Sequence, residues 1–171
     1  MKYRTLALVA ALLFATVAVA KEKHVVVTTD KFTGKTTVMM NTFGIENHSR
    51  ILGAPALYLA AWEKEGSIVL MIRSSASDWQ FLHGADVHVL ADGTPIDLGH
   101  FQKGDGKINT ILGVSVEEVV AGEVDRAVFE RMAASRDLQI EVGLFPCTVK
   151  TKDIVRLKEF ADATRQISAS K

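Results

Sequence analysis

The sequence predicts an α+β protein, with a mainly antiparallel, hairpin-built sheet and two helices near the C-terminus. β-Branched or alternating segments separated by Gly- and Asp-containing turns occupy most of the chain before residue 120, a pattern typical of antiparallel strands. The apolar residues then change to helical spacing after Glu123 and again after Thr151. Because the helices gather near one end, α+β is the expected class, and a helix-decorated β-sandwich is the alternative.

Residues 1–20 have the features of a secretory signal peptide. Lys2 and Arg4 precede an uncharged, largely apolar run that ends in small residues, Ala18-Val19-Ala20, which predicts cleavage after Ala20. The run is shorter than the roughly 20 residues of a spanning helix, so no integral membrane anchor is expected. The mature chain, residues 21–171, is the size of a single domain. We expect it to be periplasmic or secreted.

Two hairpins are predicted in the first part of the mature chain. Residues 24–42 contain two β-branched runs around the turn Asp30-Lys31-Phe32-Thr33-Gly34. Residues 57–73 contain an alternating strand, a polar turn and a strand with a continuous apolar interior. That continuity predicts a return strand buried on both faces.

The middle of the chain predicts shorter strands. Residues 87–90 and 96–98 flank an Asp92-Gly93 turn, which is a strong hairpin signal. The Gly-rich segment 103–107 predicts another turn, and residues 114–120 one more strand. Glu117 and Glu118 are neighbours on that strand and should point to opposite faces, so we expect solvated charges rather than a catalytic pair.

The C-terminal part predicts helix, strand and helix. Val128, Phe129, Met132 and Ala133 share one face of a helix that ends near residue 135. Residues 138–142 alternate as a half-exposed strand, which residues 144–149 extend across a turn at Pro146. A second helix begins near Thr151 and has an apolar stripe made by Ile154, Leu157, Phe160 and Ala161.

The charge balance and the cysteine count argue against a nucleic-acid partner and against an internal disulfide. The whole chain has 20 basic and 20 acidic residues, and removal of Lys2 and Arg4 leaves a net charge of −2. Such a balanced chain has no broad field for nucleic acid. Cys147 is the single cysteine, so no internal disulfide can form. We expect it to be a small buried apolar side chain.

The sequence contains no catalytic, metal or cofactor motif. The five histidines show no metal-ligand spacing, no nucleophile elbow is present, and no Gly-rich loop joins a strand to a helix. We therefore expect no cofactor and no metal.

Two groups of side chains are the candidate ligand-binding residues. Trp62 and Trp79 would form an exposed hydrophobic binding patch if they face solvent, and would belong to the core if they face inward. His83 and His88 lie in the turn-rich stretch 83–100. That stretch also holds Asp92 and His100, so an exported hydrolase with a loop-assembled site there is the alternative.

The turn Asp30-Lys31-Phe32-Thr33-Gly34 and the closing pattern Ile154-x-x-Leu157-x-x-Phe160 resemble uncharacterised small exported bacterial α+β domains that have an Asp-x-Phe-Thr-Gly opening turn. The resemblance implies an exported α+β domain and assigns no activity and no functional residue.

The function that the sequence favours is a non-catalytic binding or accessory module of the bacterial cell envelope. Its expected partners are an envelope protein, a peptide or a small ligand. Self-assembly into a homo-oligomer through an exposed strand edge is a further alternative.

Overall fold

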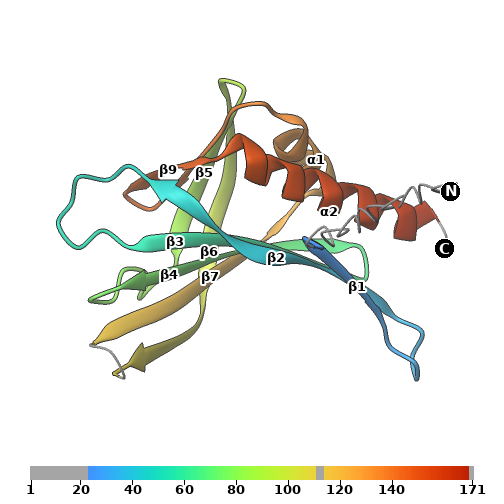
Figure 1. Cartoon of the computed structure of the whole chain (residues 1–171), viewed down its shortest axis with the longest axis horizontal. Coiled ribbons are helices and arrows are strands. Elements are labelled where there is room, and N and C mark those ends of the chain that lie inside the picture. The colour runs from blue at the N-terminus through green and yellow to red at the C-terminus, as the bar shows by residue number, and fades with distance from the viewer. Residues whose placement is uncertain (1–22, 111–113, 170–171) are drawn as a thin grey trace, which may run out of the picture.

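The computed structural model describes residues 23–110 and 114–169, with only the backbone described at Lys64, and it shows a closed antiparallel β-barrel (Figure 1). Eight strands form the barrel in the order β2-β3-β4-β7-β6-β5-β8-β9, and β9 pairs back onto β2. A ninth strand, β1, adds to β2 outside the closed ring. The predicted α+β class and the alternative sandwich are therefore both wrong. The predicted signal peptide, residues 1–20, lies outside the described residues.

The strands and helices follow one another with short connections. In chain order they are β1 (Val25–Thr29), β2 (Thr36–Asn47), β3 (Ala56–Lys64), β4 (Ser67–Ala76), β5 (Ala85–Ala91), β6 (Thr94–Asn109), β7 (Ser115–Val124), α1 (Arg126–Ala134), β8 (Leu138–Val142), β9 (Phe145–Val149) and α2 (Thr151–Ala169).

The barrel closes because β2 is long enough to have two partners on one edge. Its first half pairs with β1, from Thr36 to Met40, and its far end pairs with β9 through Glu46↔Thr148 and Asn47↔Cys147. Hairpin signals indicate pairing between sequence neighbours. The closing pair joins segments about a hundred residues apart, so the sequence pattern missed it.

Most local predictions in the strand region are confirmed, with two corrections. Both early hairpins and the Asp92-Gly93 turn are present. The predicted turn at 103–107 is wrong, because this segment lies inside the 16-residue strand β6 as an irregularity opposite β7. The return strand β4 is not buried on both faces, since its side chains alternate between buried and partly exposed as one wall of a barrel.

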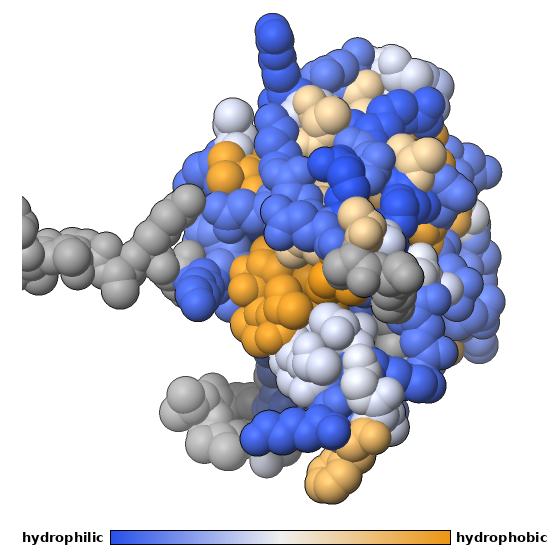
Figure 2. All heavy atoms as spheres, turned by 90° about the vertical axis from the view of Figure 1, so that its right-hand side faces the viewer, coloured by the Kyte–Doolittle hydropathy of each residue, from blue (hydrophilic) through white to orange (hydrophobic). Residues whose placement is uncertain are grey.

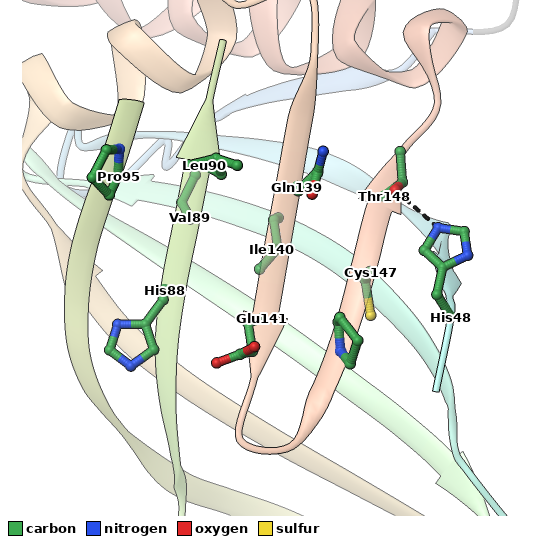
Figure 3. Close-up of a pocket in the computed structure, with 11 residues that line it drawn as sticks. His48, His88, Val89, Leu90, Pro95, Gln139, Ile140, Glu141, Cys147 and Thr148 are labelled. Atoms are coloured by element: carbon green, nitrogen blue, oxygen red, sulfur yellow. Dashed lines mark hydrogen bonds between the residues drawn. The ribbon is translucent and has the colours of Figure 1, made fainter. Parts of the chain in front are cut away.

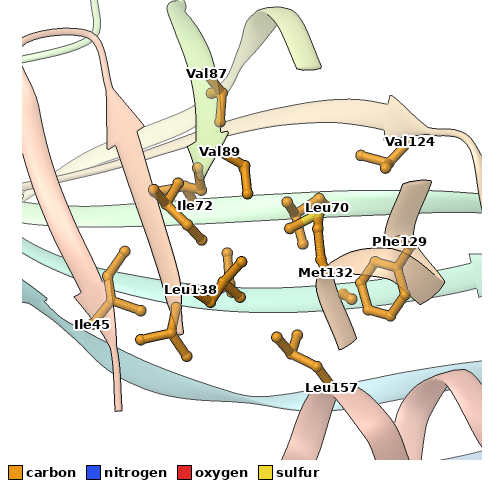
Figure 4. Packing of buried hydrophobic residues seen from close by; sticks show 14 of the residues in the cluster. Ile45, Leu70, Ile72, Val87, Val89, Val124, Phe129, Met132, Leu138 and Leu157 are labelled. Carbon is orange, nitrogen blue, oxygen red and sulfur yellow. The ribbon is translucent and has the colours of Figure 1, made fainter. Parts of the chain in front are cut away.

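Helix α2 packs against β1 and β2, and α1 packs against α2 and β4. Asp125 caps α1 by accepting hydrogen bonds from the backbone N–H groups of Ala127 and Val128. The Phe129 ring of α1 meets the Phe160 ring of α2 edge-on at 5.2 Å between centroids. Helix side chains reach the inner-facing residues of the barrel, as Figure 4 shows for Met132 beside Leu70. The helices thus belong to the same core as the strands.

In the part of the chain that the structure describes, no helix combines the length and the apolar character needed to cross a membrane.

Candidate functional site

The inside of the barrel is filled with side chains. Every one of the eight barrel strands contributes buried apolar residues to one continuous cluster, and α1 and α2 add to it (Figure 4). Phe101 is fully buried on β6, and its ring occupies the place that a Cβ atom on Gly122 of β7 would take, 2.4 Å away. Small barrels are commonly packed in this way. The outer wall is therefore the surface left for a site.

A groove of about 270 Å³ runs over the outer wall of β5, β8 and β9 (Figure 3). Side chains point outward at every second residue of these strands, as shown by the burial patterns of β5, β8 and β9. The strand register aligns them in two rows. One row is Asp97, His88, Glu141 and Pro146, and the other is Pro95, Leu90, Gln139 and Thr148.

His48 closes the groove on the β2 side. It follows β2, and its backbone N–H donates to the Pro146 carbonyl at 2.8 Å. Its Nε2 atom lies 2.9 Å from the Thr148 hydroxyl (Figure 3). At the other side of the groove, His88 Nδ1 lies 3.3 Å from the Asp97 carboxyl. Both histidine rings are therefore oriented by side chains of neighbouring strands.

Glu141 is the acidic side chain in the middle of the groove. It lies between His88 and Pro146 in the strand register, on the exposed face of β8. Among the described residues it has no ion pair or side-chain hydrogen bond, whereas Asp97 has His88. An unpaired carboxyl between the His88 and Pro146 rings, in a groove that Leu90 also lines, suits a ligand that combines a cationic group with an apolar body.

No group of three or more His, Cys, Asp or Glu side chains within residues 23–110 and 114–169 could hold a metal ion. The groove side chains therefore offer hydrogen bonds, one unpaired carboxyl and apolar contact.

Cys147 borders the groove through its backbone position, but its thiol belongs to the core. The residue is 2 % exposed, and burial raises the pKa of its thiol to about 11. Since the thiolate is the reactive form of cysteine, this side chain is the inert, buried cysteine that the sequence predicted.

The two predicted tryptophans do not form one patch. Trp62 lies half-buried on the outer face of β3, opposite Val69 of β4. Trp79 follows β4 and packs against Gly106 of β6, where an added Cβ would lie 2.7 Å from its ring. Lys103 lies over the same ring at 5.1 Å from its centroid. Gly106 pairs with Glu118 of β7, and Glu118 pairs with Ser74 of β4. Ser74 is five residues along β4 from Val69, so the strand positions beside the two tryptophans are roughly 17 Å apart at strand spacing.

The polar residues of the stretch 83–100 do not converge either. His88 lines the groove, while the ring of His100 is held by the Asp86 carboxyl at 2.8 Å and by the His83 carbonyl at 2.9 Å. Asp92 is at the opposite end of β5, where it accepts hydrogen bonds from the backbone N–H groups of Arg136 and Asp137. This geometry does not favour the loop-assembled hydrolase.

Sequence reasoning missed His48, Glu141 and Thr148 as groove residues. The alternation of residues 138–142 did predict that Glu141 faces outward, but the partners on that face depend on register and closure. The sequence predicted Glu118 to be a solvated charge, and this prediction is wrong. Glu118 is 1 % exposed and accepts hydrogen bonds from the N–H groups of Gln80 and Phe81 at 2.5 and 3.1 Å. This carboxyl is therefore a structural support for the loop 77–84.

The structure defines a closed antiparallel β-barrel with a filled interior, a lateral groove and two helices. Comparison with protein-family models, curated proteins and solved structures finds no match for the chain.

Proposed function

We propose that this protein is an exported, non-catalytic binding module of the bacterial cell envelope, and that its ligand-binding surface is the groove between His88 and His48. The ligand class that fits is a peptide segment with a Lys or Arg side chain next to apolar residues. The observation that carries the proposal is Glu141, an unpaired carboxyl on a rigid strand, flanked by apolar and histidine side chains.

The fold supports binding at this surface for two reasons. Strand residues hold fixed positions, so the groove is preformed and little conformational entropy is lost when a ligand binds. The backbone groups of β5, β8 and β9 are used in the sheet ladder, so recognition depends on the outward side chains. The Glu141 carboxyl, beside the Pro146 ring, can then select a cation over an anion.

The test is an NMR titration of residues 21–171 with two matched peptides. The first is acetyl-Leu-Lys-Pro-Leu-amide, and the second has Glu in place of Lys. We expect the Lys peptide to shift the amide signals of residues 88–90, 139–141 and 146–148, and the Glu peptide to leave them unchanged. In Glu141→Gln the affinity for the Lys peptide should fall by about 1.5- to 5-fold, the range for loss of one exposed charge pair.

Glu123→Gln is the matched control, because Glu123 is an exposed acid on β7, a strand outside the groove. It should keep the wild-type affinity. Equal binding of both peptides, absence of groove shifts, or equal losses in the two variants would each refute the proposed ligand class.

The export part of the proposal has its own measurement. The intact mass of the protein recovered from the exported fraction should correspond to residues 21–171, as expected for cleavage after Ala20. A protein that stays in the cytoplasm with residues 1–20 attached would contradict it.

A further inference from the structure

One strand of the sheet has a free edge. Among the strands within residues 23–110 and 114–169, β1 alone has a single neighbour, because it pairs with β2 and with no other strand. The barrel strands have partners on both sides. In Figure 1 the β1–β2 hairpin lies on the right, below α2. An edge of this kind presents unpaired backbone N–H and C=O groups, to which a further strand can be added.

Two hydrogen bonds show which backbone groups of β1 face away from β2. The His24 carbonyl, just before β1, accepts from an N–H group of β2 at 2.8 Å, and the Asp30 N–H, just after β1, donates across the same hairpin at 2.9 Å. The register between them is uninterrupted. Residues of an antiparallel strand alternate between directing both backbone groups to the partner and directing both away. The N–H and C=O groups of Val25, Val27 and Thr29 therefore point to the free edge.

The side chains at this edge are aliphatic on both faces of the sheet. Val27 is 52 % exposed and lies opposite the buried Val38, on the inner face. Val26 is 44 % exposed and lies opposite Met39, which is 48 % exposed, on the outer face. Figure 2, which views the molecule from the side of this hairpin, shows a compact hydrophobic area within a hydrophilic surround. A strand added to β1 would thus cover apolar side chains as well as backbone groups.

β1 lacks the features that usually protect a sheet edge from pairing. Its sequence, Val-Val-Val-Thr-Thr, has no charged residue and no proline, and its described register with β2 contains no bulge. Charged side chains, proline and bulges are common devices that keep edge strands apart. The five-residue length of β1 is the remaining restriction, and it limits any pairing to a few hydrogen bonds.

The edge of β1 is complementary to a second copy of itself. When two copies meet antiparallel about a two-fold axis at Val27, the two Val27 residues lie opposite each other, and Val25 lies opposite Thr29 of the second copy. These are the same three residues whose backbone groups are free, so each free N–H meets a free C=O. The cross-strand pairs join β-branched residues, which pack well in sheets. No charge of β1 is brought against another, since the strand has none.

We infer that the free edge of β1 is a dimerisation surface, at which two copies of this protein join their sheets by antiparallel β1–β1 pairing. A second copy always supplies an uncharged, β-branched partner of equal length, which an unrelated peptide does not. The groove lies over β5, β8 and β9, so this inference does not depend on the proposed function. A five-residue pairing is smaller than a standard protein interface, so the dimer should be weak and concentration-dependent.

The first measurement is amide hydrogen exchange by NMR on residues 21–171 at about 0.05 mM and about 1 mM, a range chosen for a weak dimer. Exchange at Val25, Val27 and Thr29 should slow as the concentration rises, because their N–H groups are free in the monomer and bonded in the dimer. The amides of Val26 and Thr28 should be protected already at the lower concentration, because they bond to β2. Sedimentation equilibrium over the same range should show the mass rising from one copy toward two.

The test variant is Val27→Pro, which removes the central donor of the free edge. It leaves the hydrogen bonds to β2 intact, since the Val27 N–H points away from β2. Both hydrogen bonds between the two Val27 residues are then lost, so the dissociation constant of the dimer should rise at least about tenfold.

Val27→Thr is the matched control, because threonine keeps the N–H group and the β-branched shape. Its dimer should have a dissociation constant within about threefold of wild type. Circular dichroism should show both variants folded. If Val27→Pro does not fold, the concentration dependence of exchange in the wild type decides the question.

The inference would be overturned by any of three results. The first is a wild type that stays monomeric at about 1 mM. The second is a dimer that Val27→Pro leaves unchanged. The third is slowed exchange confined to amides outside β1, which would assign the contact to another surface.

Discussion

The two ends of the barrel are closed by different kinds of interaction. At the helix end, α1 and α2 pack Phe129 against Phe160 within the core. Arg126 of α1 links the buried Glu63 of β3, at 3.8 Å, to Thr164 of α2, at 2.9 Å. At the loop end, the Glu118 carboxyl holds the loop 77–84 mainly through its backbone.

This difference explains where hydrophobic side chains remain exposed. Helices that close a barrel bury an apolar stripe, and their burial contributes directly to global stability. A loop that is held by backbone hydrogen bonds leaves its own side chains free to face solvent, as Leu82 does. We therefore expect the helix end to determine overall stability and the loop end to respond locally.

The largest expected effect is from Phe160→Ala at the helix end. Phe160 is fully buried, so its removal should lower the free energy of unfolding by about 3–5 kcal/mol, the range for loss of a core aromatic side chain. Urea unfolding followed by tryptophan fluorescence measures the change. Phe32→Ala removes the same side chain from an exposed turn and should change stability by less than about 0.5 kcal/mol. Similar losses in both variants would contradict the comparison.

An intermediate, local effect is expected from Glu118→Gln at the loop end. The amide side chain retains one acceptor oxygen, so part of the support for Gln80 and Phe81 is lost, at a cost of about 1–3 kcal/mol. Hydrogen exchange should become faster at the amides of Gln80 and Phe81 and stay unchanged in α2.

Glu117→Gln is the adjacent control for this prediction. Glu117 pairs with Arg73 and Lys107 on the outer face, and surface pairs of this kind contribute at most about 1 kcal/mol. Protection of Gln80 and Phe81 should therefore be retained. Faster exchange of α2 in Glu118→Gln would show that the two ends are coupled.

The smallest expected effect is a pH dependence of stability that comes from the protonation of His100. The hydrogen bond with Asp86, and then that with the His83 carbonyl, raise the pKa of His100 above its ordinary value of 6.5. Both ring nitrogens face acceptors, which favours the doubly protonated ring. The stabilisation should thus be fully present below about pH 6.5 and be lost as the pH rises through the raised pKa.

NMR titration of the ring protons of His100 measures this pKa directly. Asp86→Asn should lower it toward the ordinary value, because the main partner loses its charge. Asp97→Asn alters the carboxyl beside His88 and should leave the titration of His100 unchanged. If the pKa of His100 is unchanged in Asp86→Asn, the hydrogen bond with Asp86 is not what raises it.

Local signals predicted much of the secondary structure. The Asp92-Gly93 turn, the alternation of residues 138–142 and the apolar stripe of α2 each depend on residues close in sequence, and each is present. The segment 103–107 was mistaken for a turn because Gly104 and Gly106 are turn residues by composition. Its strand conformation depends on pairing with β7, in which Gly106 makes room for the Trp79 ring.

The candidate groove could be predicted only in part. The sequence identified His88 as a candidate and the outward direction of Glu141. Residues His48 and Thr148 are a hundred positions apart, and they meet only because β9 pairs with the end of β2. Of the two arrangements considered for Trp62 and Trp79, an exposed patch or core residues, the shared patch does not form, since strand register places the two rings far apart.

The sequence by itself determined the turns, the alternation of strands and the apolar faces of both helices, because these features follow from backbone preferences and from spacing along one segment. Only the tertiary structure decided that the sheet closes, which outer side chains share a groove, and that Glu118 is buried under a loop. Those outcomes depend on pairing between distant strands, where one shift in register would exchange the inner and outer faces.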